Sequence, residues 1–268
     1  MMTRIFAAAA LALGLSAGAL ALEGDAHAPE KHEWEHNGPF GTYDDHAVQR
    51  GFQIYQEVCA SCHSMDLMRF RNLGQRGGPF EAEGFPNPND NPVVMQIAAS
   101  YQVQDGPNDD GDMFMRPGLP SDAFPAPFEN EQQARVSNGG AYPPDLSLIV
   151  KARGGGADYI RSLLLGYEEA PEDAHLSPGQ YYNAYFEGGA IAMAPPLAEG
   201  IVSYADGTEA TVEQMAEDVV TFLTWAGDPH MEARKQMGIM VLMYLFIFAI
   251  LVYLASVSYT HLTLPTKA

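Results

Sequence analysis

The chain contains only two cysteines, Cys59 and Cys62, and the second is followed directly by His63. Two thiols three positions apart, just after a helix, can reach the two vinyl groups of one haem and form thioether bonds to them. These bonds fix the porphyrin against the chain, and the next histidine is placed to reach the iron from the same side. The Cys-x-x-Cys-His pattern therefore predicts one covalent haem c, with His63 as an axial ligand.

Other uses of a cysteine pair fit this sequence less well. A disulfide scaffold requires more cysteines, and a structural zinc site commonly uses four soft ligands. A thioredoxin-like redox pair would begin a helix after a strand, within a β–α–β unit. The sequence shows no such unit, whereas a histidine follows the pair and an amphipathic helix is predicted before it.

The N-terminal residues have the features of an export signal. Arg4 precedes an apolar, alanine-rich run from Ile5 to Leu20, and small residues occupy the positions that a signal peptidase inspects. We therefore predict a signal peptide over residues 1–21, with a retained membrane helix as the alternative. Export would carry the following domain into the periplasm, an oxidising compartment.

A second apolar run extends from Met237 to Val257 without a charged residue. As a helix it would measure roughly 30 Å, which is enough to cross a bilayer. We predict a single C-terminal membrane anchor over 233–257, with a long core helix as the alternative. Residues 22–232 then form the periplasmic cytochrome c domain. The polar stretch 258–268 lacks the basic cluster expected after an anchor, and is a tail of doubtful origin.

Helical periodicity and turn residues predict a mainly α fold with long irregular loops, and no long alternating strand pattern occurs. An irregular stretch from about Gly74 to Phe128 is rich in Gly, Pro, Asn and Asp. The predicted helices run from Asp44 or Asp45 to about Ala60, over Val93–Tyr101, from Pro143-Pro144-Asp145 onwards, over Ala157–Leu165, and from the Thr211 and Gln214 capping box to Gly227.

The surface is strongly acidic, with 34 acidic and 14 basic residues and a formal net charge of −20. Such a surface repels phosphates, so nucleic acid is excluded as a partner. No Lys or Arg occurs from Ser162 to Ala233, although Asp and Glu are frequent there. Beside a haem this stretch would attract a basic protein partner. An acidic solvated surface without a docking role is the alternative.

A methionine sulfur opposite the histidine would raise the potential of a haem that transfers electrons. Excluding the signal, the anchor, an apolar helix face and positions close to His63 leaves Met95, Met113, Met115, Met193 and Met231. Met193 is favoured, because Gly188-Gly189 before it and Pro195-Pro196 after it indicate a stiff, extended segment. Met113 and Met115 are the main alternatives.

Several segments carry a resemblance to a known family: Arg50–Tyr55 with Cys59–His63, Tyr142–Ser147, Lys151–Arg153 with Asp158–Ile160, Gly188–Leu197, and Ala216–Leu223 continuing through Trp225 to Arg234–Gly238. The Met-Ala-Pro-Pro and Pro-Pro-Asp-Leu-Ser motifs are far more specific than Cys-x-x-Cys-His. Together these segments resemble the cytochrome c1 family, the membrane-anchored haem subunits of ubiquinol–cytochrome c oxidoreductase (the bc1 complex), in its bacterial form.

The resemblance implies Met193 as the distal iron ligand and contacts from Arg153 and Tyr159 to the haem propionates. It also implies that Asn138, Pro143 and Pro144 lie near the haem. The haem would take electrons from the Rieske iron–sulfur protein and pass them to cytochrome c. Cytochrome b and membrane lipid would be further partners in a dimeric complex of the bacterial inner membrane. The isolated chain would carry electrons, and the complex would be the enzyme.

Some bacterial members of this family hold the methionine loop with an extra cysteine pair, which this chain lacks. We therefore expect packing alone to hold Met193. Three other functions remain open from the sequence: a haem peroxidase, a membrane-anchored haem sensor, and a tethered c-type cytochrome that serves another periplasmic oxidoreductase.

Overall fold

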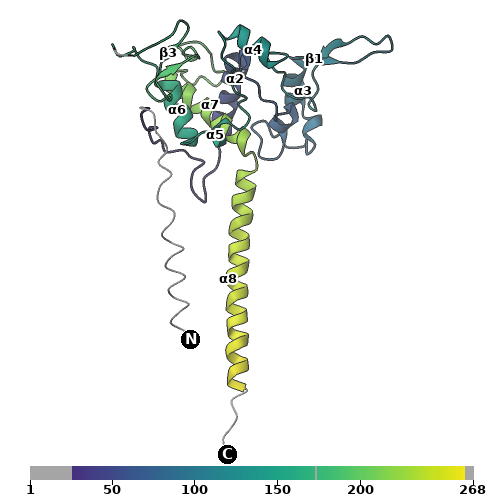
Figure 1. Ribbon diagram of the computed structural model, residues 1–268. Coiled ribbons are helices and arrows are strands. Elements are labelled where there is room, and N and C mark those ends of the chain that lie inside the picture. Colours follow the sequence, from purple (N-terminus) through teal and green to yellow (C-terminus); the bar gives the residue numbers. More distant parts are fainter. Residues whose placement is uncertain (1–25, 173, 263–268) are drawn as a thin grey trace, which may run out of the picture.

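The computed structural model describes residues 26–172 and 174–262, which form a mainly helical body and one long projecting helix (Figure 1). The predicted signal peptide and residues 263–268 lie outside this range. The helices are α2 (Asp45–Glu57), α3 (Pro92–Ala99), α4 (Glu131–Ser137), α5 (Ile149–Ala152), α6 (Gly156–Leu165), α7 (Val212–Gly227) and α8 (Met231–Leu262), with short 3₁₀ helices η1 (Cys59–Ser61), η2 (Phe70–Gly74) and η3 (Pro88–Asp90).

Helices α2 and α7 pack against each other and form the centre of the core. Capping residues start both helices: the Asp44 carboxylate accepts from His46 N at 2.9 Å, and Thr211 Oγ1 accepts from Gln214 N at 3.1 Å. The aromatic ring of Phe222 on α7 lies 5.7 Å from that of Phe52 and 5.8 Å from that of Tyr55. The apolar faces predicted from the periodicity of both segments are therefore the faces that pack.

The two helices approach closely at Gly51. A methyl group added there would overlap the backbone carbonyl of Asp218 and lie 2.7 Å from Phe222 Cβ, so only glycine fits. Next to this contact, the Arg50 guanidinium binds both carboxylate oxygens of buried Asp218, each at 2.9 Å. This bidentate pair fixes the register of α2 on α7.

The strands are short and form two separate antiparallel pairs. β1 (Gln102–Asp105) pairs with β2 (Phe114–Pro117), with Gln102 opposite Pro117, and this ribbon extends sideways from the body (Figure 1). β3 (Tyr181–Tyr182) pairs with β4 (Ala190–Ile191), with Tyr181 opposite Ile191. Neither β1 nor β2 was predicted from the sequence, because β1 contains a single apolar residue, Val103, and β2 is largely exposed.

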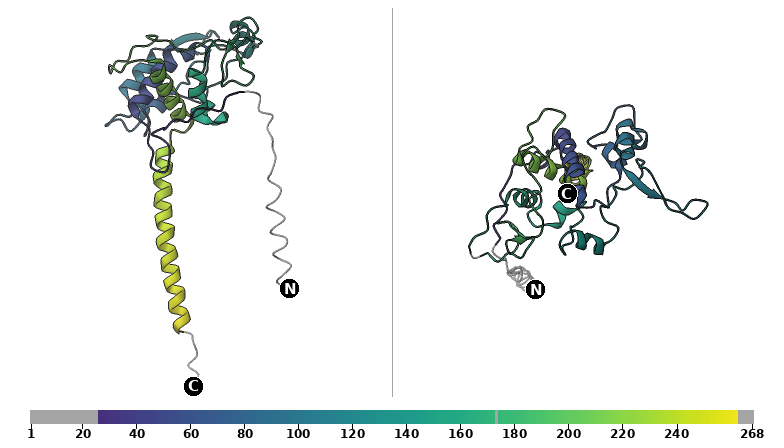
Figure 2. Two further views of the ribbon diagram at one scale, coloured as in Figure 1. Left: turned by 90° about the vertical axis from the view of Figure 1, so that its left-hand side faces the viewer. Right: turned by 90° about the horizontal axis from the view of Figure 1, so that it is seen from above.

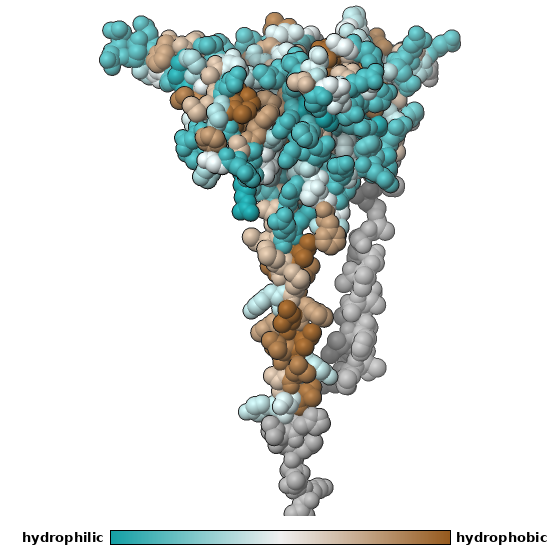
Figure 3. Space-filling view, turned by 180° about the vertical axis from the view of Figure 1, so that it is seen from behind, coloured by the Kyte–Doolittle hydropathy of each residue, from teal (hydrophilic) through white to brown (hydrophobic). Residues whose placement is uncertain are grey.

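Helix α8 is long and apolar enough to cross a membrane, and its apolar stretch is not buried in the body. Figures 2 and 3 show it extending away from a largely hydrophilic head as a single apolar rod. The alternative of a core helix is therefore wrong. The helix begins at Met231, two residues before the predicted start of the anchor.

Polar contacts pin the first turn of α8 to the body. The Lys235 ammonium donates to the carbonyls of His36 at 2.7 Å and Gly41 at 2.9 Å, and Glu232 Oε1 accepts from Tyr43 N at 2.7 Å. These bonds come from the segment that precedes α2. The direction of α8 relative to the core is thus fixed by residues nearly two hundred positions away in the sequence.

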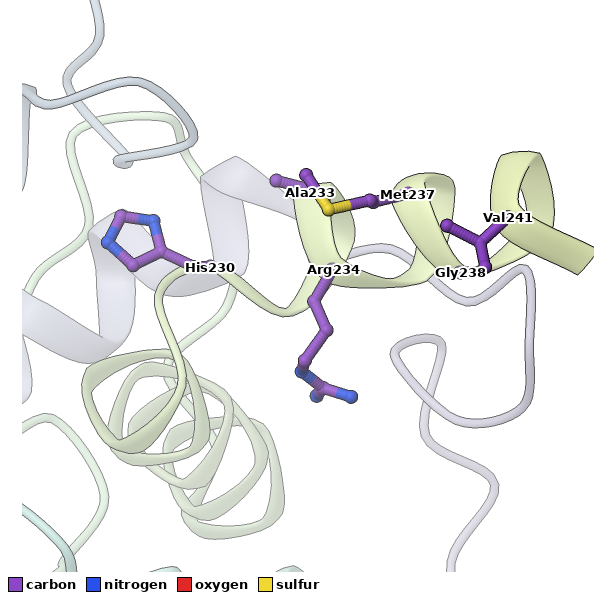
Figure 4. A pocket seen from close by; sticks show the side chains of 6 residues that line it. All are labelled: His230, Ala233, Arg234, Met237, Gly238 and Val241. Atoms are coloured by element: carbon purple, nitrogen blue, oxygen red, sulfur yellow. The ribbon is translucent and has the colours of Figure 1, made fainter.

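A groove runs along the start of α8, where the head meets the apolar helix (Figure 4). It is mostly apolar and is lined by His230, Ala233, Arg234, Met237, Gly238 and Val241. None of the residues predicted to hold a cofactor lines this groove. It marks the boundary between head and helix, and the candidate site lies elsewhere.

We predict that Gly51→Ala destabilises the protein by about 2 kcal/mol, because the methyl group forces α2 away from α7. Guanidinium unfolding of the detergent-solubilised chain, followed by circular dichroism, measures the change. Gly238→Ala is a matched control, since Gly238 is also helical and an added methyl group meets no atom within 4 Å. A Gly51→Ala variant as stable as the wild type would contradict the close approach.

Candidate functional site

The two cysteines and His63 lie in one turn directly after α2. α2 ends at Glu57, short of the predicted end at about Ala60, because the chain tightens into η1 after Val58. Cys62 N and His63 N both donate to the carbonyl of Cys59, at 3.1 and 2.9 Å. Both thiols are free and partly buried.

The surroundings of Cys59 do not favour thiol redox chemistry. Burial raises the pKa of the Cys59 thiol to about 12, whereas a redox-active cysteine requires an accessible thiolate at neutral pH. Within residues 26–172 and 174–262, no three or more His, Cys, Asp or Glu side chains gather to form a metal site. The turn supplies a thiol pair and one imidazole, which is the donor set that fits covalent haem.

The imidazole of His63 is oriented by a backbone carbonyl. Its Nδ1 lies 2.8 Å from the oxygen of Pro144, and because a carbonyl can only accept, Nδ1 must carry the proton. Nε2 is then unprotonated and has a lone pair for a metal. Burial lowers the pKa of His63, although the bond to Pro144 acts in the opposite direction, so the ring is neutral at pH 7.

The carbonyl of Pro144 is itself held by a polar clamp between residues 64–67 and 144–147. The Asp145 carboxylate accepts from Ser64 Oγ at 2.9 Å and from Asp66 N at 2.7 Å. Leu146 N donates to the Ser64 carbonyl at 2.9 Å. The prediction that a helix begins at Pro143–Asp145 is wrong. Asp145 also binds Ser147 N, an Asx turn, and α5 begins only at Ile149.

Asn138 is the C-terminal cap of α4. Its side-chain amide donates to the carbonyl of Ala134 at 2.7 Å, and it is partly buried. The chain then turns through Gly139 and Gly140, which both have positive φ, and leads to Pro143. Asn138 therefore closes the helix before the segment that contacts His63.

Arg153 and Tyr159 flank the junction of α5 and α6. Burial raises the pKa of the Tyr159 hydroxyl, while the positive charge of Arg153 acts to lower it and the negative charge of Glu187 acts to raise it. Arg153 is exposed and forms no ion pair with any residue that the structure describes. A guanidinium without such an ion pair suits an external carboxylate, such as a propionate.

Met193 is half-buried and follows the β3–β4 hairpin. The Tyr167 hydroxyl donates to its backbone carbonyl at 3.1 Å. Packing alone therefore does not hold this segment, contrary to expectation. Gly188 and Gly189 form a tight turn with φ of +76° and +70°, so the predicted extended conformation begins only after the glycine pair.

The other candidate methionines have different surroundings. Met115 lies in β2 and is 57% exposed. Met113 directly precedes β2 and is 53% exposed. Met95 is exposed on α3, and Met231 is buried at the start of α8. Two of these four methionines, Met113 and Met115, thus lie in or beside a ribbon that extends away from the body (Figure 1).

The structure brings His63 into direct contact with Pro144, and the charge of Arg153 acts on the Tyr159 hydroxyl. No hydrogen bond between described residues joins Met193 to the Cys59–His63 turn. Sequence reasoning missed two residues that contact this region. Tyr167 binds the Met193 carbonyl, and the fully buried Asn183 anchors the β3–β4 hairpin. Single polar residues outside a motif leave no sequence pattern. The spacing of Asp145 and Ser147, typical of an Asx turn, could have revealed the clamp.

The chain is similar to known proteins over most of its length. The model of the Cytochrome C1 family matches residues 34–261. The cytochrome c1 of Rhodospirillum rubrum is 42% identical, with 90% of each chain covered. The cytochrome b/c1 of Bradyrhizobium diazoefficiens is 47% identical over 93% of this chain, which spans 38% of that protein.

A mitochondrial cytochrome b-c1 complex catalytic subunit of Candida albicans is 49% identical, over 81% of this chain and 72% of the relative. The matched range includes the Cys59–His63 turn, the Pro144 clamp, the Met193 segment and the start of α8. The chain belongs to the cytochrome c1 family.

Proposed function

We propose that this chain is the haem-bearing electron-transfer subunit of a bacterial ubiquinol–cytochrome c oxidoreductase. Cys59 and Cys62 would hold one haem c through thioethers, and His63 Nε2 would bind its iron. The observation that carries this proposal is the hydrogen bond from His63 Nδ1 to the Pro144 carbonyl, in the same turn as the free thiol pair. It fixes the tautomer and ring orientation that an iron ligand needs.

Met193 is the proposed ligand on the other side of the iron. A haem with histidine and methionine ligands supplies reversible one-electron chemistry at a raised potential. The chain would contribute the positioning of both side chains: the Pro144 clamp orients the His63 ring, and the β3–β4 hairpin ends two residues before Met193. No proton donor or nucleophile is needed for this task.

The α5–α6 junction would supply the propionate contacts. Arg153 offers an exposed guanidinium without an ion pair among the described residues, and its charge acts on the Tyr159 hydroxyl. A buried or partly buried propionate requires such a donor. Pro143, Pro144 and Asn138 would line the same side of the haem as His63, because they belong to the segment that binds its ring.

In this role the chain receives electrons from the Rieske iron–sulfur protein and passes them to cytochrome c. The names of the relatives from Bradyrhizobium and Candida, cytochrome b/c1 and a cytochrome b-c1 complex subunit, support this assignment. The stretch from Ser162 to Ala233 lacks Lys and Arg and contains Met193, so its negative field would speed the encounter with a basic cytochrome c.

The proposed location is the bacterial inner membrane, with α8 as the single anchor and the head in the periplasm. The exposed apolar length of α8 supports a membrane span, and cytochrome b and lipid would cover it. A cleaved signal peptide over residues 1–21 would export the head, and the complex would be dimeric. Isolation of the complex with cytochrome b and the iron–sulfur protein tests these partners, and separates this role from a tethered cytochrome that serves another oxidoreductase.

We predict that Asp145→Asn lowers the free energy of unfolding by about 2 kcal/mol at pH 7, because charged hydrogen bonds of the clamp are lost. Burial alone would raise the pKa of Asp145, but hydrogen bonds from Asp66 and Ser147 hold it below its usual value. The contribution of the carboxylate is therefore present above about pH 4 and is lost as pH falls through the lowered pKa.

Guanidinium unfolding at several pH values measures this effect. Asp66→Asn is the control, since Asp66 is exposed and joins the clamp through its backbone N–H. The two variants should differ at pH 7 and converge in acid. A difference that stays constant into strong acid would show that the carboxylate charge plays no part.

We predict that Met193→Leu keeps the haem attached, abolishes the sulfur-to-iron absorption band, and lowers the midpoint potential by on the order of 0.1 V or more. Optical spectra and redox titration of the purified complex measure these changes. Met115→Leu removes the exposed methionine of the ribbon and should leave both readouts unchanged. An unchanged potential in Met193→Leu would reject the ligand, and a high-spin wild-type haem would favour a peroxidase or sensor.

A further inference from the structure

The segment that carries Met193 is anchored at its two ends but exposed between them. Ile191 and Leu197 are buried in the body, whereas Ala192, Ala194 and Pro195 are exposed. The β3–β4 ladder ends at Ile191, so it does not extend to Met193. The Met193 backbone therefore lies outside the ladder, and the chain has no cysteine there that could cross-link it.

The hairpin before Met193 is fastened to the end of α6. The Asn183 side chain is fully buried and donates to the Leu163 carbonyl at 2.7 Å, and Asn183 N donates to the Gly189 carbonyl at 2.9 Å. Ala184 N donates to the Gly166 carbonyl at 3.2 Å. These bonds form a fixed frame made of the last turn of α6 and the hairpin.

Tyr167 follows Gly166, the C-terminal cap of α6, and belongs to this frame because it forms a β-bridge with Asn183. Its hydroxyl donates to the Met193 carbonyl at 3.1 Å, which joins the exposed middle of the segment to the frame. We propose that Tyr167 is a positioning residue that holds the Met193 backbone through this hydrogen bond, and so keeps the thioether sulfur on the haem iron. This role rests on the proposed function of Met193 as the distal ligand.

Tyr167 is partly buried and paired with Asn183 in a β-bridge, so the donor is held in place. Neutral hydrogen bonds of this kind shift local opening equilibria by about fivefold.

Other tyrosines of the hairpin do not share this contact. The Tyr185 hydroxyl donates to Glu30 at 3.0 Å, and Tyr182 packs its ring where a side chain at Gly189 would lie. Tyr181 is 42% exposed on β3. Tyr181→Phe is thus a control that removes a hydroxyl from the same hairpin without removing the bond to Met193.

The test uses the purified complex with haem attached, and compares wild type, Tyr167→Phe and Tyr181→Phe. Imidazole is added to the oxidised protein, where it replaces the methionine sulfur and removes the sulfur-to-iron band. We expect Tyr167→Phe to bind imidazole about fivefold more tightly than wild type, since the methionine segment opens more readily. The covalent haem content and the denaturant midpoint report whether the variant is folded.

Equal imidazole affinity in Tyr167→Phe and wild type would overturn the proposal, as would an equal gain in Tyr181→Phe. A folded Tyr167→Phe protein that keeps its haem but shows increased affinity supports a local role and not a general loss of stability. If the wild type shows no sulfur-to-iron band, the ligand assignment itself fails. If the wild type shows the band but Tyr167→Phe binds imidazole no more tightly, only the role of Tyr167 fails.

Discussion

The hydrogen bond from His63 Nδ1 to the Pro144 carbonyl is the contact on which the candidate site depends. It joins the turn that holds both thiols to a segment about eighty residues later, and it decides which ring nitrogen is available to a metal. The Asp145 clamp holds the carbonyl in place, so the orientation of the imidazole is set by the backbone. A loop of this kind can hold a ligand rigidly only because its own polar groups are satisfied.

In the proposed function, the rest of the head would support one haem between the Cys59–His63 turn and the Met193 segment. Helices α2 and α7, fixed by the close approach at Gly51 and the Arg50–Asp218 pair, place the cysteine turn at the end of α2. Helix α6 carries Tyr159 near its start. Beyond its end, Asn183 fastens the β3–β4 hairpin to the helix, and Tyr167 binds the carbonyl of Met193. The pinned first turn of α8 then gives this head a fixed orientation above the apolar helix.

Much of this arrangement could be predicted from the sequence, because it is encoded locally. The Cys-x-x-Cys-His turn, the capping residues of α2 and α7, and the apolar length of α8 are each read from neighbouring residues. The contacts that sequence reasoning missed are non-local: the clamp joins residues 64–67 to 144–147, and Tyr167 acts on a carbonyl 26 positions away. Backbone acceptors such as Pro144 O have no residue-specific signal. Strands β1 and β2 were missed because their exposed side chains show no apolar period.

Covalent attachment of the haem is the central claim, and one measurement tests it directly. The chain, produced in a host that attaches c-type haem, is denatured, extracted with acidic organic solvent and stained for haem on a denaturing gel. We expect the haem stain to remain with the polypeptide, and to be lost from the Cys59→Ala/Cys62→Ala double variant. If the solvent removed all the colour and the wild-type band did not stain, the proposed site and function would both be wrong.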